Sequence, residues 1–189
     1  MKGIGAFSSV FMVVIGLFFA QAPRYSKAST SAENPAHASL VDMHDGTIYD
    51  TDTQLSWLKD AGAGGKKTYD QAVAWAASLN AGSGFGGLKG WRLPNADRDC
   101  GSDINCTNSE MGHLYYSELR NKGAKFIKML TNTGPFTNLQ ADDYWSCTED
   151  DVTHSDLAWG FSFSGGAQID YPRSEKNYAW AVRPGARSK

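Results

Sequence analysis

Three aromatic anchors, spaced far apart in one stretch, constrain the fold of this chain more than any other feature. They are Gly90–Pro94 (GWRLP), Tyr144–Ser146 (YWS) and Tyr178–Arg183 (YAWAVR). Each anchor places a tryptophan in a strand-like segment, where alternation turns one face of the strand inward. We therefore expect the tryptophans to form the core of one domain rather than platforms for a ligand. These tryptophans are Trp91, Trp145 and Trp180, and we expect the same of Trp159, which lies in a further strand-like run.

The N-terminus has the composition of an export signal. Lys2 precedes the largely apolar run Ile4–Ala20, and small residues follow at usable cleavage sites. We assign residues 1–28 to a signal peptide, 29–39 to a linker, 40–185 to the domain and 186–189 to a tail. The protein is then expected to be secreted, periplasmic or on the cell surface, with no membrane span after cleavage. An uncleaved anchor is the alternative, because the apolar run could just cross a bilayer.

The charge balance restricts the partners. Removal of residues 1–28 takes away Lys2, Arg24 and Lys27 and changes the net charge from −2 to −5. An acidic protein is a poor partner for nucleic acid, whose binding depends on Lys and Arg. The same charge disfavours a broad surface for anionic polysaccharide.

Cysteine usage indicates one disulfide. Cys100 and Cys106 can close a small loop in an oxidising compartment. A zinc site is the poorer reading of this pair, since no second Cys or His pair has the required spacing. Cys147 then stays free, and beside Trp145 it is expected to be a small buried side chain rather than a nucleophile.

Two helices are predicted. Thr68 and Gln71 have the spacing of a capping box at the start of 68–79. The residues expected on its buried face are Ala72, Val73, Ala76 and Leu79. Thr107 and Glu110 repeat the capping box before a second helical stripe that ends at Gly123. The stripe consists of Met111, Leu114, Tyr115 and Leu119.

The remaining patterns predict short strands. Asp45-Gly46 is a turn dipeptide between Leu40–Asp42 and Thr47–Tyr49, which predicts a hairpin. Further strands are expected at Leu55–Trp57, Tyr144–Thr148, Trp159–Phe163, Ala167–Asp170 and Tyr178–Val182. We expect the first and last strands to meet. Helices segregated from antiparallel strands indicate the α+β class.

The ordered motifs resemble a known family. They are DTDTQLSWLK at 50–59, the helix at 68–79, GWRLP at 90–94, SEMGHLYY at 109–116, FTNL at 136–139, YWSCTE at 144–149, AWGFSFSGG at 158–166 and YAWAVRPG at 178–185. Together they are similar to the C-terminal domain of the Legionella collagen-like adhesin, over about residues 40–185. The resemblance implies a C-type-lectin-like α+β fold, with two helices packed on short antiparallel strands, and an exported or surface-exposed bacterial protein. In the namesake adhesin the domain mediates attachment and binds sulfated glycans. This chain shows no collagen-like Gly-x-y stalk before the domain and no obvious trimerising segment, so trimerisation does not transfer. Its net charge is unfavourable for sulfated glycans, so that ligand does not transfer either.

Three loops are expected to contact the ligand, because rigid strands can hold irregular loops in place. They are Gly82–Gly90, Asn95–Asn105 and Glu149–Ser155. The acidic loop Asn95–Asn105 is the first candidate ligand site. Its candidate ligand-binding residues are Asp97, Asp99, Asp103 and Asn105, and a second loop adds Glu149, Asp150 and Asp151. Oxygen ligands in a bent loop suit Ca²⁺, and Asp97, Asp99 and Asp103 would hold it. The spacing is not that of an EF-hand. A solvated loop that holds no cofactor is the alternative.

No catalytic residue is identified. The histidines are scattered, and no nucleophile elbow occurs. We expect a binding module for a surface glycan, matrix or envelope protein that is not an enzyme. One alternative is a structural subunit of a surface assembly, which would be a homo-oligomer. A lectin-fold oxidase-like enzyme is a weaker alternative, because it would need the thiols of Cys100 and Cys106.

Overall fold

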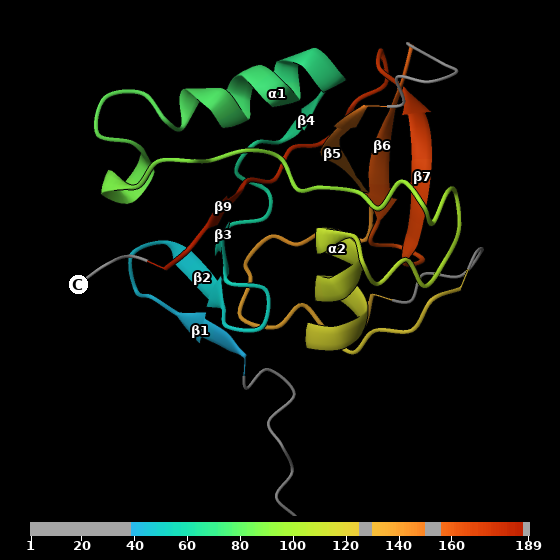
Figure 1. Cartoon of the computed structure of the whole chain (residues 1–189), viewed down its shortest axis with the longest axis horizontal. Helices are drawn as coiled ribbons and strands as arrows, with labels where there is room; N and C mark the ends of the chain where they lie inside the picture. Colours follow the sequence, from blue (N-terminus) through green and yellow to red (C-terminus); the bar gives the residue numbers. More distant parts are fainter. Residues whose placement is uncertain (1–38, 125–129, 150–155, 187–189) are drawn as a thin grey trace, which may run out of the picture. The chain divides into compact units, whose positions relative to one another are not determined.

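The computed structural model describes residues 39–124, 130–149 and 156–186 (Figure 1). The predicted signal peptide and nearly all of the linker lie outside these ranges, as do Asp150 and Asp151. Within the described ranges, no helix combines the length and apolar character needed to cross a membrane.

The first sheet is built on the predicted hairpin. Its strands, in spatial order, are β1 (Leu40–Asp42), β2 (Thr47–Asp50), β3 (Leu55–Leu58) and β9 (Val182–Pro184). Asp45 accepts hydrogen bonds from the amide and the hydroxyl of Thr47 at 3.1 and 2.6 Å. Gly46 follows with a φ of 87°, which glycine adopts without steric cost. The hairpin is therefore confirmed. The expected meeting of the first and last strands is wrong, because β9 pairs with β3.

The second sheet contains the other predicted strands of the final third. Its spatial order is β4 (Lys66–Lys67), β8 (Asn177–Tyr178), β5 (Asp143–Glu149), β6 (Leu157–Ser162) and β7 (Ala167–Pro172). The β5–β8 pair is parallel, whereas the other neighbours are antiparallel.

The last aromatic anchor joins the two sheets. The sequence predicts one strand over Tyr178–Val182, but the chain leaves the second sheet after Tyr178 and enters the first at Val182. Trp180 lies in this connection with no exposed surface. Its indole Nε1 donates a hydrogen bond to the carbonyl of Leu58, at 2.8 Å. This side chain is therefore anchored to β3 while its backbone crosses between the sheets.

The first predicted helix is confirmed as α1 (Tyr69–Ser78). Both hydrogen bonds of the Thr68–Gln71 capping box are present, and α1 contacts β4 and β5 (Figure 1). Ala72 and Ala76 are buried as expected, whereas Val73 is 41% exposed. The small buried residues let the helix pack closely. A 3₁₀ turn, η1 (Phe85–Gly87), follows in the glycine-rich loop.

The second helix is shorter than predicted and begins at a different residue. Ser109, rather than Thr107, caps α2 (Glu110–His113), because its hydroxyl accepts from the Gly112 amide at 3.0 Å. The chain then continues as a π-helical turn, η2 (Leu114–Glu118). The Leu119 amide donates to the carbonyl of Leu114 five residues earlier, at 2.8 Å.

The fold-class prediction is therefore wrong. Two sheets with nine strands dominate the described residues, beside one ten-residue helix and the short α2–η2 segment. This is not a C-type-lectin-like arrangement of two helices on strands, and the α+β class describes it only loosely. The physical reason is that most of the regular secondary structure in the described residues pairs as strands, largely antiparallel hairpins such as β1–β2–β3 and β5–β6–β7, whereas the second helix is only the short α2–η2 segment.

The tryptophan core is confirmed at three of four positions. Trp91, Trp145 and Trp180 are at most 3% exposed. Trp159 is only half-buried, since the buried positions on this part of β6 are the small residues Ala158 and Gly160. The sheets therefore enclose an aromatic core, and most of the tryptophans are not available as platforms.

Candidate functional site

The Trp-Arg-Leu-Pro segment lies against the first sheet and directs the chain into the acidic loop. Arg92 forms a bridge with Val182 of β9, through backbone hydrogen bonds of 2.9 and 2.8 Å. The buried Trp91 donates from Nε1 to the carbonyl of Leu88, at 3.1 Å. Within this segment only Arg92 pairs with a strand, as an isolated bridge, so the strand-like pattern of residues 91–94 does not form a full strand.

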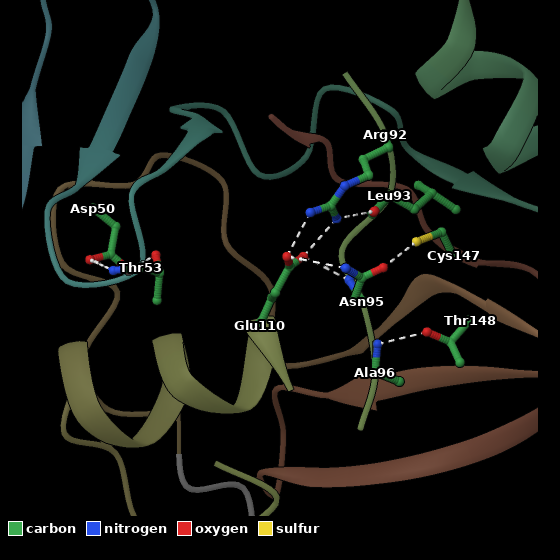
Figure 2. Close-up of polar contacts among 9 residues, drawn as sticks. All are labelled: Asp50, Thr53, Arg92, Leu93, Asn95, Ala96, Glu110, Cys147 and Thr148. Atoms are coloured by element: carbon green, nitrogen blue, oxygen red, sulfur yellow. Dashed lines mark hydrogen bonds and ion pairs between the residues drawn. The ribbon is translucent and has the colours of Figure 1, made fainter. Parts of the chain in front are cut away.

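Arg92 and Glu110 form the main ionic contact beneath the acidic loop (Figure 2). The guanidinium donates to both carboxylate oxygens, at 2.7 and 2.6 Å. Glu110 also accepts from the backbone amide of Asn95, at 2.7 Å. The hydrogen bond to Glu110 raises the pKa of Arg92 despite partial burial. Bidentate, charge-assisted pairs fix geometry, so this pair holds the start of the loop on α2.

Cys147 and Thr148 of β5 hold the same loop from the other side (Figure 2). The Cys147 thiol donates to the side-chain oxygen of Asn95, at 2.9 Å. The Thr148 hydroxyl accepts from the amide of Ala96, at 3.0 Å. Burial raises the pKa of Cys147 above its ordinary value of 9.0, although Arg92 acts in the opposite direction. A protonated thiol is a weak nucleophile, so the group supports loop anchoring rather than catalysis.

We expect Cys147 to be a free but slowly reacting thiol. The structure joins Cys100 to Cys106, as predicted, and leaves Cys147 reduced. Because a raised pKa keeps the thiol protonated at neutral pH, the rate of alkylation should be low at pH 7 and increase as the pH rises above about 9. Titration of the native, unreduced protein should count one thiol, and three would contradict the assignment. Cys147→Ser is the control.

Hydrogen bonds hold the acidic loop in place, but its carboxylates do not lie close together. Asp97 accepts from the Asp99 amide at 3.0 Å, and Asp103 accepts from the Ile104 amide at 2.8 Å. Gln168 of β7 receives and donates hydrogen bonds across the loop at Asp97. Asn105 donates its amide to the hydroxyl of Tyr116, at 3.0 Å.

In the part of the chain that the structure describes, Asp97, Asp99 and Asp103 are not among the residues grouped closely enough to share a metal ion. Calcium binding there stays a prediction without preformed geometry. Of the second loop, Glu149 pairs with Arg173 at 3.6 Å, whereas Asp150 and Asp151 lie outside the described residues.

A groove of about 460 Å³ lies between the end of β3, α1 and η1. We call it the Trp75 groove, since Trp75 and Leu79 of α1 form one wall. The remaining lining residues include Lys59, Asp60, Phe85 and Thr137. Phe85 is 40% exposed. The Phe85 ring packs edge to face against the buried Trp91 ring, with the two centroids 5.8 Å apart. This contact fixes the orientation of the Phe85 side chain in the groove.

Polar groups lie at one side of the Trp75 groove and are fixed in place. Asp60 Oδ1 accepts from the Gly62 amide at 2.9 Å and from the Asn138 side chain at 3.0 Å. Lys59 Nζ donates to Asp42 at 2.7 Å, and this hydrogen bond lowers the pKa of Asp42. Pockets that combine aromatic walls with a few placed polar groups are the common form of small-ligand sites.

The sequence predicts Gly82–Gly90 as a contact loop, and Phe85 of this loop lines the groove, but the groove itself was not predicted. Trp75 was outside the predicted buried face of its helix, and Phe85 stood in a glycine-rich segment expected to be a loop. Trp75 could have been noticed as a large apolar residue outside the apolar stripe of its helix, and Phe85 as a large apolar residue in a glycine-rich loop. Their convergence needed the loop after α1 to fold back, which it does through a hydrogen bond from the Phe85 amide to the Leu79 carbonyl, at 2.8 Å.

Comparison with protein families supports the resemblance drawn from the motifs. The family described as the Lcl C-terminal domain matches residues 46–183. The chain belongs to this family. The match extends from the turn of the first hairpin to β9, and it includes the acidic loop and the Trp75 groove of this Lcl C-terminal domain. Comparison with curated proteins finds no match.

Proposed function

We propose that this Lcl C-terminal domain is a binding module for surface recognition or adhesion, and that the Trp75 groove receives a sugar ring of a glycan. The observation that carries the proposal is the pairing of accessible aromatic surface with anchored polar groups in one groove. Family membership supports an adhesin-like role, because attachment is what the namesake domain does.

The chemistry of the groove favours an uncharged sugar. The C–H face of a pyranose can pack on Phe85 and Trp75, while Asp60 and Thr137 offer hydrogen bonds to hydroxyl groups. The predicted net charge of −5 after removal of residues 1–28 opposes binding of sulfated chains. We propose binding rather than catalysis, since burial raises the pKa of the free Cys147 thiol and its hydrogen bond to Asn95 anchors a loop.

Phe85→Ala and Trp75→Ala are expected to weaken glycan binding. Loss of one aromatic contact of this size corresponds to about 1.5–3 kcal/mol, or roughly ten- to a hundredfold in Kd. A glycan array with the purified protein identifies the sugar, and calorimetry with that sugar measures the change. Val41→Ala is the matched control, since Val41 is 42% exposed but does not line the groove.

Two outcomes would contradict this proposal. Unchanged affinity in folded groove variants would place the site elsewhere. An array without hits, combined with a large homo-oligomer in solution, would instead support the structural subunit.

A further inference from the structure

The end of β2 and the α2–η2 segment bring together a second set of polar side chains, away from the Trp75 groove. Asp50, His113 and Glu118 each place one potential ligand atom within 4.8 Å of the others. Asp50 is 1% exposed and Glu118 is 3% exposed, while His113 is half-buried. In the described residues, no lysine or arginine forms an ion pair with either carboxylate. Two buried carboxylates at such short range need a compensating positive charge.

The π-helical turn creates this arrangement. On an α-helix, residues five apart are separated by about 140° around the axis, so their side chains diverge. In η2 a backbone amide donates to the carbonyl five residues earlier rather than four. This wider turn brings residues 113 and 118 onto the same side, and His113 Nε2 lies 3.2 Å from Glu118 Oε1. Single π turns inside helices occur frequently at functional sites. The π turn therefore places His113 and Glu118 together, with Asp50 nearby.

Neighbouring groups orient both carboxylates. Asp50 accepts from the amide of Asp52 at 2.9 Å. It also accepts from the amide of Thr53 at 3.3 Å and from the Thr53 hydroxyl at 2.6 Å (Figure 2). Glu118 accepts from the hydroxyl of Ser39. Hydrogen bonds of this kind, made to the ligand side chains by an outer set of residues, are typical of metal sites.

We propose that Asp50, His113 and Glu118 bind one divalent transition-metal ion, with Zn²⁺ as the best match. An imidazole nitrogen with two carboxylates is a zinc-type set, whereas Ca²⁺ prefers oxygen alone. Zinc binds such ligand atoms at about 2.0–2.2 Å. Side-chain rotations that move each ligand atom by about 1 Å would therefore bring all three within bonding distance of one ion. The bound ion would tie the first hairpin to the helical segment and neutralise the buried charge.

The test uses the purified chain after dialysis against EDTA, with Zn²⁺ as the probe in calorimetry. We expect one equivalent to bind. At free zinc a hundredfold above Kd, the midpoint of thermal unfolding should rise by roughly 5–10 °C. His113→Gln should weaken binding at least tenfold, since even outer substitutions at metal sites cost about 10–100-fold.

His44→Gln is the matched control, because the His44 side chain is 89% exposed on the same hairpin. Its zinc affinity should be unchanged. Binding of Co²⁺ gives a second readout, as its visible absorption should appear in the native protein and in His44→Gln but not in His113→Gln. The proposal is overturned if folded protein takes up no zinc, or if folded His113→Gln binds zinc with unchanged affinity.

Discussion

Replacing Trp180 with alanine should lower the free energy of unfolding by about 3–5 kcal/mol, the range measured for large aromatic residues in closed cores. Trp180 has no exposed surface. Its indole packs against rings from four segments, with centroids 4.8–5.9 Å away; these rings belong to Trp57, Phe136, Tyr144 and Phe163. The loss of stability should be large because the cavity would open between the two sheets, which cannot move together to fill it.

Denaturant unfolding followed by circular dichroism measures this effect. Phe85→Ala is the aromatic control, because Phe85 is 40% exposed and its loss should cost about 1 kcal/mol or less. Similar values for the two variants would mean that Trp180 does not join the sheets in the way described. The Phe85→Ala measurement also establishes whether the groove variant is folded before its binding is judged.

Replacing Glu110 with alanine should have the second largest effect, a loss of about 2–4 kcal/mol. Removal of one member of a buried ion pair leaves the other uncompensated, and here the amide of Asn95 also loses its acceptor. The Arg92 side chain is 32% exposed and that of Glu110 is 16% exposed, so the loss should stay below that of a fully buried pair. The acidic loop should become more accessible to proteolysis.

The same unfolding experiment on Asp70→Ala provides the control for this pair. Asp70 accepts from Arg173 at 2.7 Å, but its side chain is 79% exposed. Such surface pairs contribute about 1 kcal/mol or less, because water screens them. An equal, small loss in both variants would show that the Arg92–Glu110 contact is no more than a surface ion pair.

Local signals were read correctly where neighbouring residues alone decide the structure. Asp45-Gly46 specifies a turn, and Thr68 with Gln71 specifies a helix start, because each satisfies backbone groups within a few residues. The predicted start of α2 at Thr107 is wrong, because local signals leave two choices there. Thr107 and Ser109 both offer a capping hydroxyl, and only the packed structure selects Ser109.

The site residues show the same difference between local signals and contacts that only the folded structure decides. The family could be recognised from the ordered set of motifs, because each motif consists of residues close together in the chain, as in Gly90–Pro94. Their partner Glu110 was seen only as a capping residue, since its contact with Arg92 spans the whole acidic loop. Phe85 lies in the predicted contact loop Gly82–Gly90, but neither periodicity nor spacing indicates that Trp75 and Phe85 share a groove.

Composition and local motifs were thus enough to establish one aromatic-cored domain, its disulfide, its first hairpin and helix, and its family. Tertiary structure alone decided that the alternating run Tyr178–Val182 divides between two sheets, that η2 takes a π turn, and that Asp50 lies beside His113 and Glu118. The physical reason is that alternation and capping act between near neighbours, whereas sheet membership and side-chain clusters depend on which distant segments bury one another.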